Sequence, residues 1–176
     1  MDNSNLQTDL TFDPELFKEL AETLLYDSDY DYIDEARCRT VISRLYYAIF
    51  LRIRETLLSV FRELNARTLD LFKRLYRTGE IHATIRDVLM FIDPFIGHLF
   101  ANLGQLRRDA DYNLRKRILP EETEEALRNA RELQNSLQDV SHILRSCKEH
   151  LMDISLIMWD RVWIKEQRRR QKSTSR

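Results

Sequence analysis

The chain has 176 residues, of which 43% are hydrophobic and 32% charged, and its formal net charge is −1. A chain of this length can form one domain that folds without disulfides or structural metals. Its longest apolar stretch contains an aspartate, a proline and a histidine, which argues against a membrane span. The polar, acidic start lacks the pattern of a signal peptide, and both cysteines lie in helical patterns. We therefore expect reduced thiols and a cytoplasmic location.

Charge is distributed unevenly along the chain. The first 36 residues contain eleven acidic residues and a single basic one, Lys18, whereas residues 161–176 contain seven basic residues and one acidic residue. Such an asymmetry has two interpretations: both ends are simply solvated, or they contact each other, a second subunit or nucleic acid.

Three glycines, three prolines and the absence of sustained apolar–polar alternation predict an all-α protein. Residues 1–12 are expected to be a flexible acidic segment. A helix is predicted over residues 13–26, because in Asp13-Pro14-Glu15 the aspartate can cap the first turn and proline fits there without losing a hydrogen bond. A second helix, apolar on one face, is predicted over residues 34–64.

Shorter helices are predicted over residues 68–77 and 81–91. Asp93-Pro94 is expected to kink this helix or to begin a new one, because proline removes a helical hydrogen bond. The helix then continues to about Ala110. The last helix begins at Pro120, followed by acidic residues that suit its N-terminal dipole. The expected fold is an antiparallel four- to five-helix bundle with a long C-terminal helix.

The last helix carries apolar residues at alternating steps of four and three from Ala126 to Met158, which is typical of a heptad seam. One helix over residues 121–171 would be about 75 Å long, so its far half is expected to project, to fold back at a break or to pack on another subunit. For residues 126–140 an ordinary core stripe across the body of the bundle is favoured, and beyond about residue 140 a partner helix is favoured. The predicted interface residues are Leu137, Val140, Leu144, Leu151, Ile154 and Met158.

Two short motifs lie about sixty residues apart: Ser43-Arg44-Leu45-Tyr46-Tyr47-Ala48, and Arg107-Arg108-Asp109-Ala110-Asp111-Tyr112 at the end of another helix. With His82 at a helix start and with Glu122-Ala126-Ala130, they resemble the HEPN superfamily (higher eukaryotes and prokaryotes nucleotide-binding). The likeness is to its small prokaryotic branch, which has Ser-Arg-x-Tyr-Tyr-Ala and Arg-x-x-Ala-Asp-Tyr segments.

The resemblance implies a helical bundle over residues 13–138, dimerisation across the faces that carry the arginine motif, and a role with RNA in toxin–antitoxin or defence systems. Residues 139–176 fall outside it and are expected to form a helical extension with a basic tail. Catalytic family members cleave RNA without metal and place a histidine four to six intervening residues after the arginine. Here tyrosine, asparagine and leucine occupy those places after Arg107.

The missing histidine bears on the chemistry. An arginine can grip a phosphate with its planar fork, and a histidine moves protons near neutral pH. Tyrosine, with a reference pKa of about 10, and aspartate, at about 3.9, are poor substitutes. His98 lies about 13 Å before Arg107 along a continuous helix. We expect cleavage to be slow or absent; if it occurs, the candidate catalytic residues are Arg107, Asp111 and Tyr112.

The arginine motif has two interpretations, a packing and dimerisation role or direct contact with RNA. In the first, Asp111 pairs with Arg44 or Arg107 while Tyr46 and Tyr47 belong to the core. No metal site and no cofactor is expected. The candidate RNA-binding residues are Arg44, Arg107, Arg108, Arg115, Lys116, Arg117, Arg168, Arg169 and Arg170.

The favoured function is therefore an RNA-associated module of a toxin–antitoxin or defence system, non-catalytic or weakly active, that acts through dimerisation and through binding RNA or a partner. One alternative is a metal-independent endoribonuclease toxin neutralised by a partner nucleotidyltransferase. A weaker one is a helical protein-interaction adaptor with no nucleic-acid role. The expected partners are a second copy of the chain, RNA, and a nucleotidyltransferase or larger effector protein.

Overall fold

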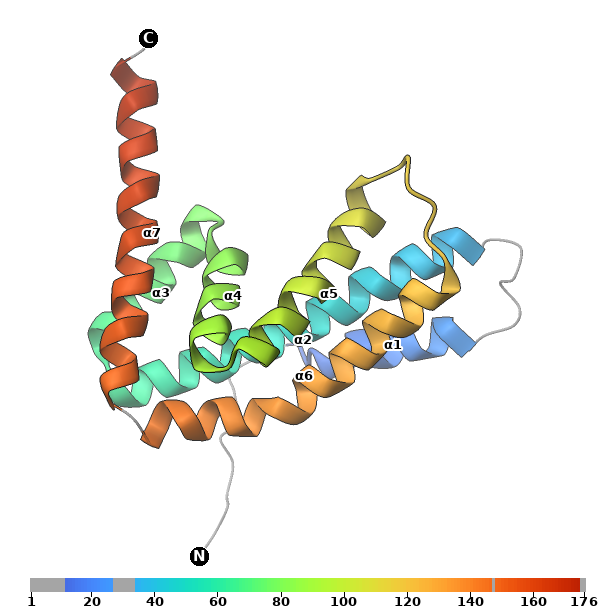
Figure 1. The fold of residues 1–176 in the computed structure, drawn as a ribbon, viewed down its shortest axis with the longest axis horizontal. Coiled ribbons are helices and arrows are strands. Elements are labelled where there is room, and N and C mark those ends of the chain that lie inside the picture. Colours follow the sequence, from blue (N-terminus) through green and yellow to red (C-terminus); the bar gives the residue numbers. More distant parts are fainter. Residues whose placement is uncertain (1–11, 27–33, 147, 175–176) are drawn as a thin grey trace, which may run out of the picture.

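The structure is a computed structural model that describes residues 12–26, 34–146 and 148–174 (Figure 1). Within these ranges the chain forms helices and no strand, which confirms the all-α prediction. Most of residues 1–12, expected to be flexible, lie outside the described part. The helices are α1 (Glu15–Tyr26), α2 (Asp34–Leu64), α3 (Ala66–Thr78), α4 (Ile81–Ile92), α5 (Pro94–Tyr112), α6 (Pro120–Ser146) and α7 (Lys148–Thr174).

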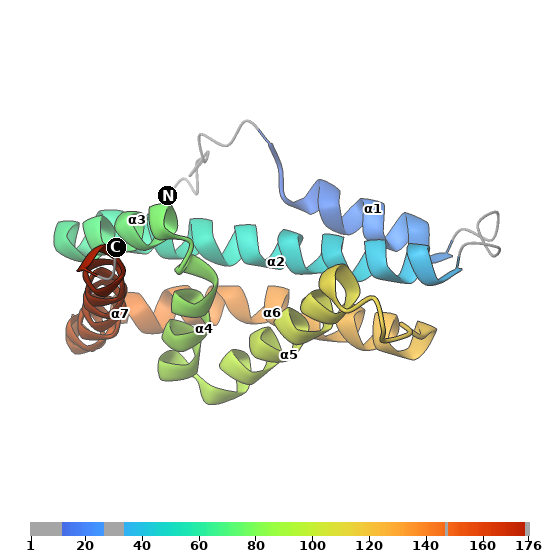
Figure 2. The same ribbon diagram turned by 90° about the horizontal axis from the view of Figure 1, so that it is seen from above.

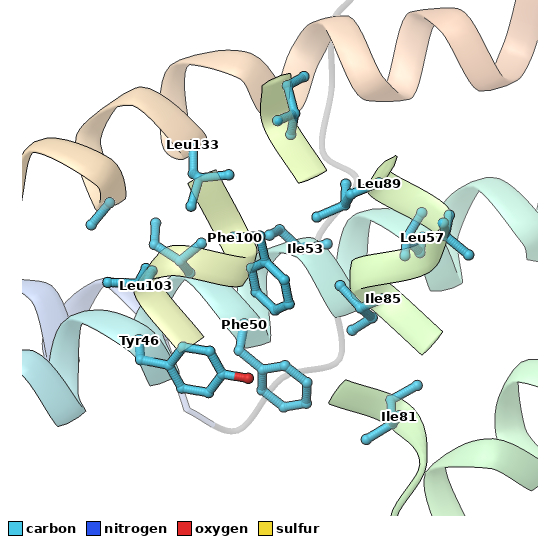
Figure 3. Packing of buried hydrophobic residues seen from close by; sticks show 14 of the residues in the cluster. Tyr46, Phe50, Ile53, Leu57, Ile81, Ile85, Leu89, Phe100, Leu103 and Leu133 are labelled. Carbon is cyan, nitrogen blue, oxygen red and sulfur yellow. The ribbon is translucent and has the colours of Figure 1, made fainter. Parts of the chain in front are cut away.

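Helix α2 is the central element of the fold. It packs against α1, α3, α4, α5 and α6, with α1 on the side opposite α4 and α5 (Figure 2). Its residues Tyr46, Phe50 and Ile53 meet Phe100 of α5 in the core, where α4 and α6 also contribute side chains (Figure 3). Residues 41–50 of α2 are buried or half-buried on all sides, and a helix segment buried in this way must be enclosed by others.

The helix ends follow local sequence signals. Asp13 accepts a hydrogen bond from the Glu15 backbone N–H at 2.9 Å, and Asp93 accepts one from Phe95 at 2.7 Å, with Pro94 in the first turn of α5. Asn65 caps α3, and Gly79 ends it in the left-handed conformation that glycine adopts most easily. The predicted starts at Asp13 and Asp93-Pro94 are confirmed, whereas α3 begins two residues before its predicted start at residue 68.

The expected long C-terminal helix is instead two helices. Three outcomes were considered for its far half, and the structure shows the one in which the chain breaks and folds back onto its own helices. Helix α6 ends at Ser146, and α7 turns away from it to run beside α3 and α4 (Figure 1). Thr68 of α3 and Ser155 of α7 are joined by a hydrogen bond of 2.5 Å.

The heptad seam is buried inside this one chain, which corrects its assignment as an intermolecular interface. Because α7 folds back, the seam covers the chain's own helices, so any contact with a second subunit would use other side chains. The boundary expected between residues 138 and 139 also falls within α6, inside one continuous core. Leu137 is partly buried and packs against the same core. The other five predicted interface residues are at most 4% exposed: Val140, Leu144, Leu151, Ile154 and Met158.

Two further findings concern the whole described chain. Among the described residues, none of the helices combines the length and apolar character that crossing a bilayer requires. Cys38 is a buried free thiol, and Cys147 lies outside the described residues.

The close approach of α4 and α5 predicts opposite effects for two glycine substitutions. A Cβ added at Gly97 would lie 2.5 Å from the Met90 Cα, whereas one at Gly104 would lie 3.5 Å from a Tyr46 ring carbon, an ordinary contact. We expect Gly97→Ala to destabilise the protein by about 1–3 kcal/mol through overpacking. Gly104→Ala should be neutral or stabilising by up to about 1 kcal/mol. Urea unfolding of both variants tests this, and equal effects would contradict the packing of α4 on α5.

Candidate functional site

The arginine of the second motif is fixed by aromatic hydroxyls. Arg107 Nη2 donates to the hydroxyl of Tyr47 on α2 at 2.7 Å and to that of Tyr112, one turn further along α5, at 2.9 Å. Its Nε lies 2.6 Å from a carboxylate oxygen of Asp111. Asp111 thus pairs with Arg107, one of the two partners expected for it.

The guanidinium also lies over aromatic rings. Its central carbon is 4.8 Å from the ring centre of Tyr112, 5.2 Å from Tyr47 and 5.8 Å from Tyr46. These cation–π contacts and the two hydrogen bonds hold the side chain, which is 16% exposed, in one orientation. We call this group, with His82, the Arg107 site.

His82 joins the site from α4. Its Nδ1 lies 2.7 Å from the Tyr46 hydroxyl oxygen, and its ring stacks on Phe50 with ring centres 4.1 Å apart. Burial, together with the positive charge of Arg107, lowers the pKa of His82, and burial raises the pKa of Tyr46 to about 12. Both side chains are therefore neutral at pH 7.

The hydrogen bond between Tyr46 and His82 bears on the tautomer of His82. Among the described residues, the Tyr46 hydroxyl has one hydrogen-bond partner, His82 Nδ1. The buried hydroxyl can place its proton in a hydrogen bond only by donating to Nδ1, and we therefore infer that the proton of the neutral imidazole resides on Nε2. In this state His82 offers a hydrogen-bond donor, and its basic lone pair is occupied.

Arg39 positions the end of α5 that carries the motif. Its guanidinium donates to the backbone oxygens of Ala110 at 2.7 Å and Lys116 at 2.6 Å, and pairs with Glu35 at 2.7 Å. Glu35 also accepts a hydrogen bond from the Ile118 backbone N–H at 3.4 Å. The last carbonyls of a helix lack partners within it, so Arg39 closes α5 and ties the 113–119 loop to α2.

The structure brings only some of the candidate RNA-binding residues to this site. Arg107 and Arg108 lie in it, with Arg108 exposed and hydrogen-bonded to Gln105 at 2.8 Å. In the adjoining loop Arg115 and Arg117 are exposed, whereas Lys116 is held between Asp109 at 2.9 Å and Glu122 at 2.7 Å. Lys116 therefore lies between two carboxylates, whereas Arg107 is paired with one, Asp111.

The remaining candidates lie elsewhere. Arg44 faces α1, where its guanidinium sits 5.1 Å from the ring centre of Phe17, so it does not pair with Asp111 as considered from the sequence. Arg168 and Arg170 are on α7, at the opposite end of the molecule from the 113–119 loop (Figure 1). The side chain of Arg169 lies outside the described part of the chain.

Sequence reasoning did not assign two residues of the site. It searched for a histidine along the chain near Arg107, whereas His82 comes from another helix and was noted only as part of the family resemblance. Arg39 was not singled out, because nothing local distinguishes it from the other arginines of α2. In the described part of the chain, no cluster of three or more His, Cys, Asp or Glu is placed to hold a metal ion.

Comparison with family models, with curated proteins and with solved structures finds no match for this chain.

The lowered pKa of His82 predicts a loss of stability in mild acid. Because the unfolded chain binds the His82 proton more readily than the folded one, stability should be complete above the unfolded pKa of about 6.5 and should decline as pH falls below it. We expect the urea midpoint to fall between pH 7.5 and 5.5, and to fall less in His82→Gln. An equal fall in both proteins would contradict the burial of a neutral His82.

Proposed function

We propose that this chain is a HEPN-like RNA-associated module that binds a backbone phosphate of RNA at the Arg107 site and cleaves RNA slowly or not at all. The observation that carries the proposal is the fixed guanidinium of Arg107, held by Tyr47 and Tyr112 beside a neutral His82. A preoriented arginine fork among hydrogen-bond donors suits a phosphate.

The charges and donors at the site favour an anion. Nη1 of Arg107 has no hydrogen bond to any described residue, and Arg108 beside it is exposed. The neutral His82 belongs to the same aromatic cluster and adds no opposing charge, and the site's carboxylate, Asp111, is already paired with Arg107. The Tyr112 side chain is 68% exposed, which leaves an aromatic face on which a base of single-stranded RNA can stack.

The same geometry explains why we expect little cleavage. To attack its own phosphate, the RNA 2′-hydroxyl needs a base that removes its proton, and general acid–base catalysis typically contributes about 10²–10⁴-fold. The lone pair of His82 that could serve is occupied by the Tyr46 hydroxyl. The site can thus hold RNA without a free base for the reaction.

A metal-independent endoribonuclease is the second candidate function, because His82 stands in the same aromatic cluster as Arg107. It would require the other tautomer, in which Nδ1–H donates to Tyr46 and Nε2 accepts a proton. In either case the resemblance to HEPN proteins supports a place in a toxin–antitoxin or defence system. It also supports a partner nucleotidyltransferase or larger effector protein.

RNA binding should depend on Arg107 more than on other surface arginines. We expect Arg107→Ala to weaken binding of a labelled single-stranded RNA about tenfold or more at low salt, and to reduce the slope of log affinity against log salt by about 0.7. Arg107→Lys keeps the charge but loses the planar fork, so its affinity for RNA should lie between those of the unaltered protein and Arg107→Ala. Arg128→Ala on the exposed surface of α6 is the matched control. Fluorescence anisotropy measures all four proteins, and equal affinities would contradict the proposal.

A cleavage assay with the same RNA distinguishes the binding module from the endoribonuclease. Incubation with end-labelled RNA in the presence of a chelator should leave it intact if the module only binds. Metal-independent cleavage that is lost in both Arg107→Ala and His82→Gln would select the endoribonuclease.

Dimerisation is also proposed, with two copies of the 107–112 segment near the twofold axis. Two apolar side chains in the loop after α5 are exposed and available for such a contact, Leu114 and Leu119. Leu114 is 83% exposed, so Leu114→Asp should yield a monomer without unfolding the chain. Light scattering at tens of micromolar tests this: a monomeric mass for the unaltered protein would refute the dimer.

A further inference from the structure

Helix α7 carries apolar side chains on two separate faces, about 120° apart around the helix axis at 3.6 residues per turn. Its inner face packs against α3 and α4 through Leu151, Ile154, Met158 and Val162, none more than 8% exposed. Its outer face carries a second apolar stripe at steps of four, three and four, and these side chains are between 46% and 69% exposed. The stripe consists of Met152, Leu156, Trp159 and Trp163.

The charges of α7 are divided between the same two faces. Arg161 and Lys165 point inward and form ion pairs, Arg161 with Asp87 of α4 and Lys165, at 2.6 Å, with Glu80, the residue before α4. The acidic side chains beside the outer stripe are exposed, and none forms an ion pair with a described residue. They are Glu149, Asp153, Asp160 and Glu166.

We propose that the outer face of α7 is a docking site for an amphipathic helix of a partner protein, one whose apolar stripe is bordered by lysine or arginine. The alternating spacing of the stripe is that of a seam between two helices. It spans about 17 Å, or three helical turns, from residue 152 to residue 163. The acids along it select the charge of the partner, because complementary charges fix the choice and register of paired helices.

Charge also decides against two other occupants. If a second copy of the chain packed antiparallel on this stripe, Leu156 of one chain would face Trp159 of the other. Asp153 of one chain would then lie beside Asp160 of the other, and these like charges repel. A membrane surface rich in anionic lipid would be repelled by the acids along the stripe. The fold leaves the stripe uncovered, whereas a basic amphipathic helix would cover its apolar side chains and neutralise its acids together.

The chain supplies its own probe for this face. Its two tryptophans are Trp159 and Trp163, so intrinsic tryptophan emission reports on the stripe alone. The ligand to use is a synthetic helical peptide of about three heptads with leucine at the seam positions and lysine beside them. Its twin carries glutamate in place of lysine, and both peptides lack tryptophan.

We expect the lysine peptide to shift the emission to shorter wavelength and to bind at least about tenfold more tightly than the glutamate twin at low salt. Asp153→Lys with Asp160→Lys should reverse this preference. Glu121→Lys with Glu124→Lys, the same change of charge on exposed positions of α6, should leave it unaltered. Leu156→Asn should weaken the binding of either peptide, with circular dichroism showing that the helices persist.

Four results would overturn the proposal: no emission shift with either peptide, equal affinity for the two peptides, a shift that appears on raising the protein concentration alone, and a shift with vesicles of phosphatidylserine but not with the lysine peptide. The third would show a second copy on the stripe, and the fourth a membrane.

Discussion

The structure depends on one constraint, the burial of helix α2 around most of its circumference. A helix with apolar residues on several faces is stable only when other helices enclose it, and α2 is enclosed by five. This arrangement places α1 on one side of α2 and α4 with α5 on the other. The residues that build the Arg107 site therefore come from three helices but share one support, and Tyr46 and Tyr47 are its fixed part.

Two polar contacts give that hydrophobic arrangement its precision. Arg39 fastens the last turn of α5 and the loop after it to the start of α2, so the arginine motif cannot shift along α2 without breaking several hydrogen bonds. Burial keeps His82 and Tyr46 neutral, and their mutual hydrogen bond occupies Nδ1 of the histidine. This occupied nitrogen is the reason that we propose phosphate binding with little cleavage, although the site contains a histidine.

Local signals made most of the helix boundaries predictable. The caps at Asp13, Asp93 and Gly79 act within a few residues, so the sequence contains all the information they need. The break after Ser146 was not predictable in the same way, because residues 121–171 contain neither glycine nor proline. The seam spacing was correct, but spacing alone does not say whether a seam faces its own chain or another. His82 was missed for a related reason, since its place beside Arg107 depends on how α4 packs on α2.

The central claim is that the Arg107 guanidinium itself contacts RNA. Side-chain nitrogen spectra of arginine, recorded while a short single-stranded RNA is added, test this most directly. The account predicts that the Arg107 resonances shift and narrow at substoichiometric RNA, while those of Arg161 on α7, which is paired with Asp87, stay in place. Shifts confined to the arginines of α7, with Arg107 unaffected, would contradict it.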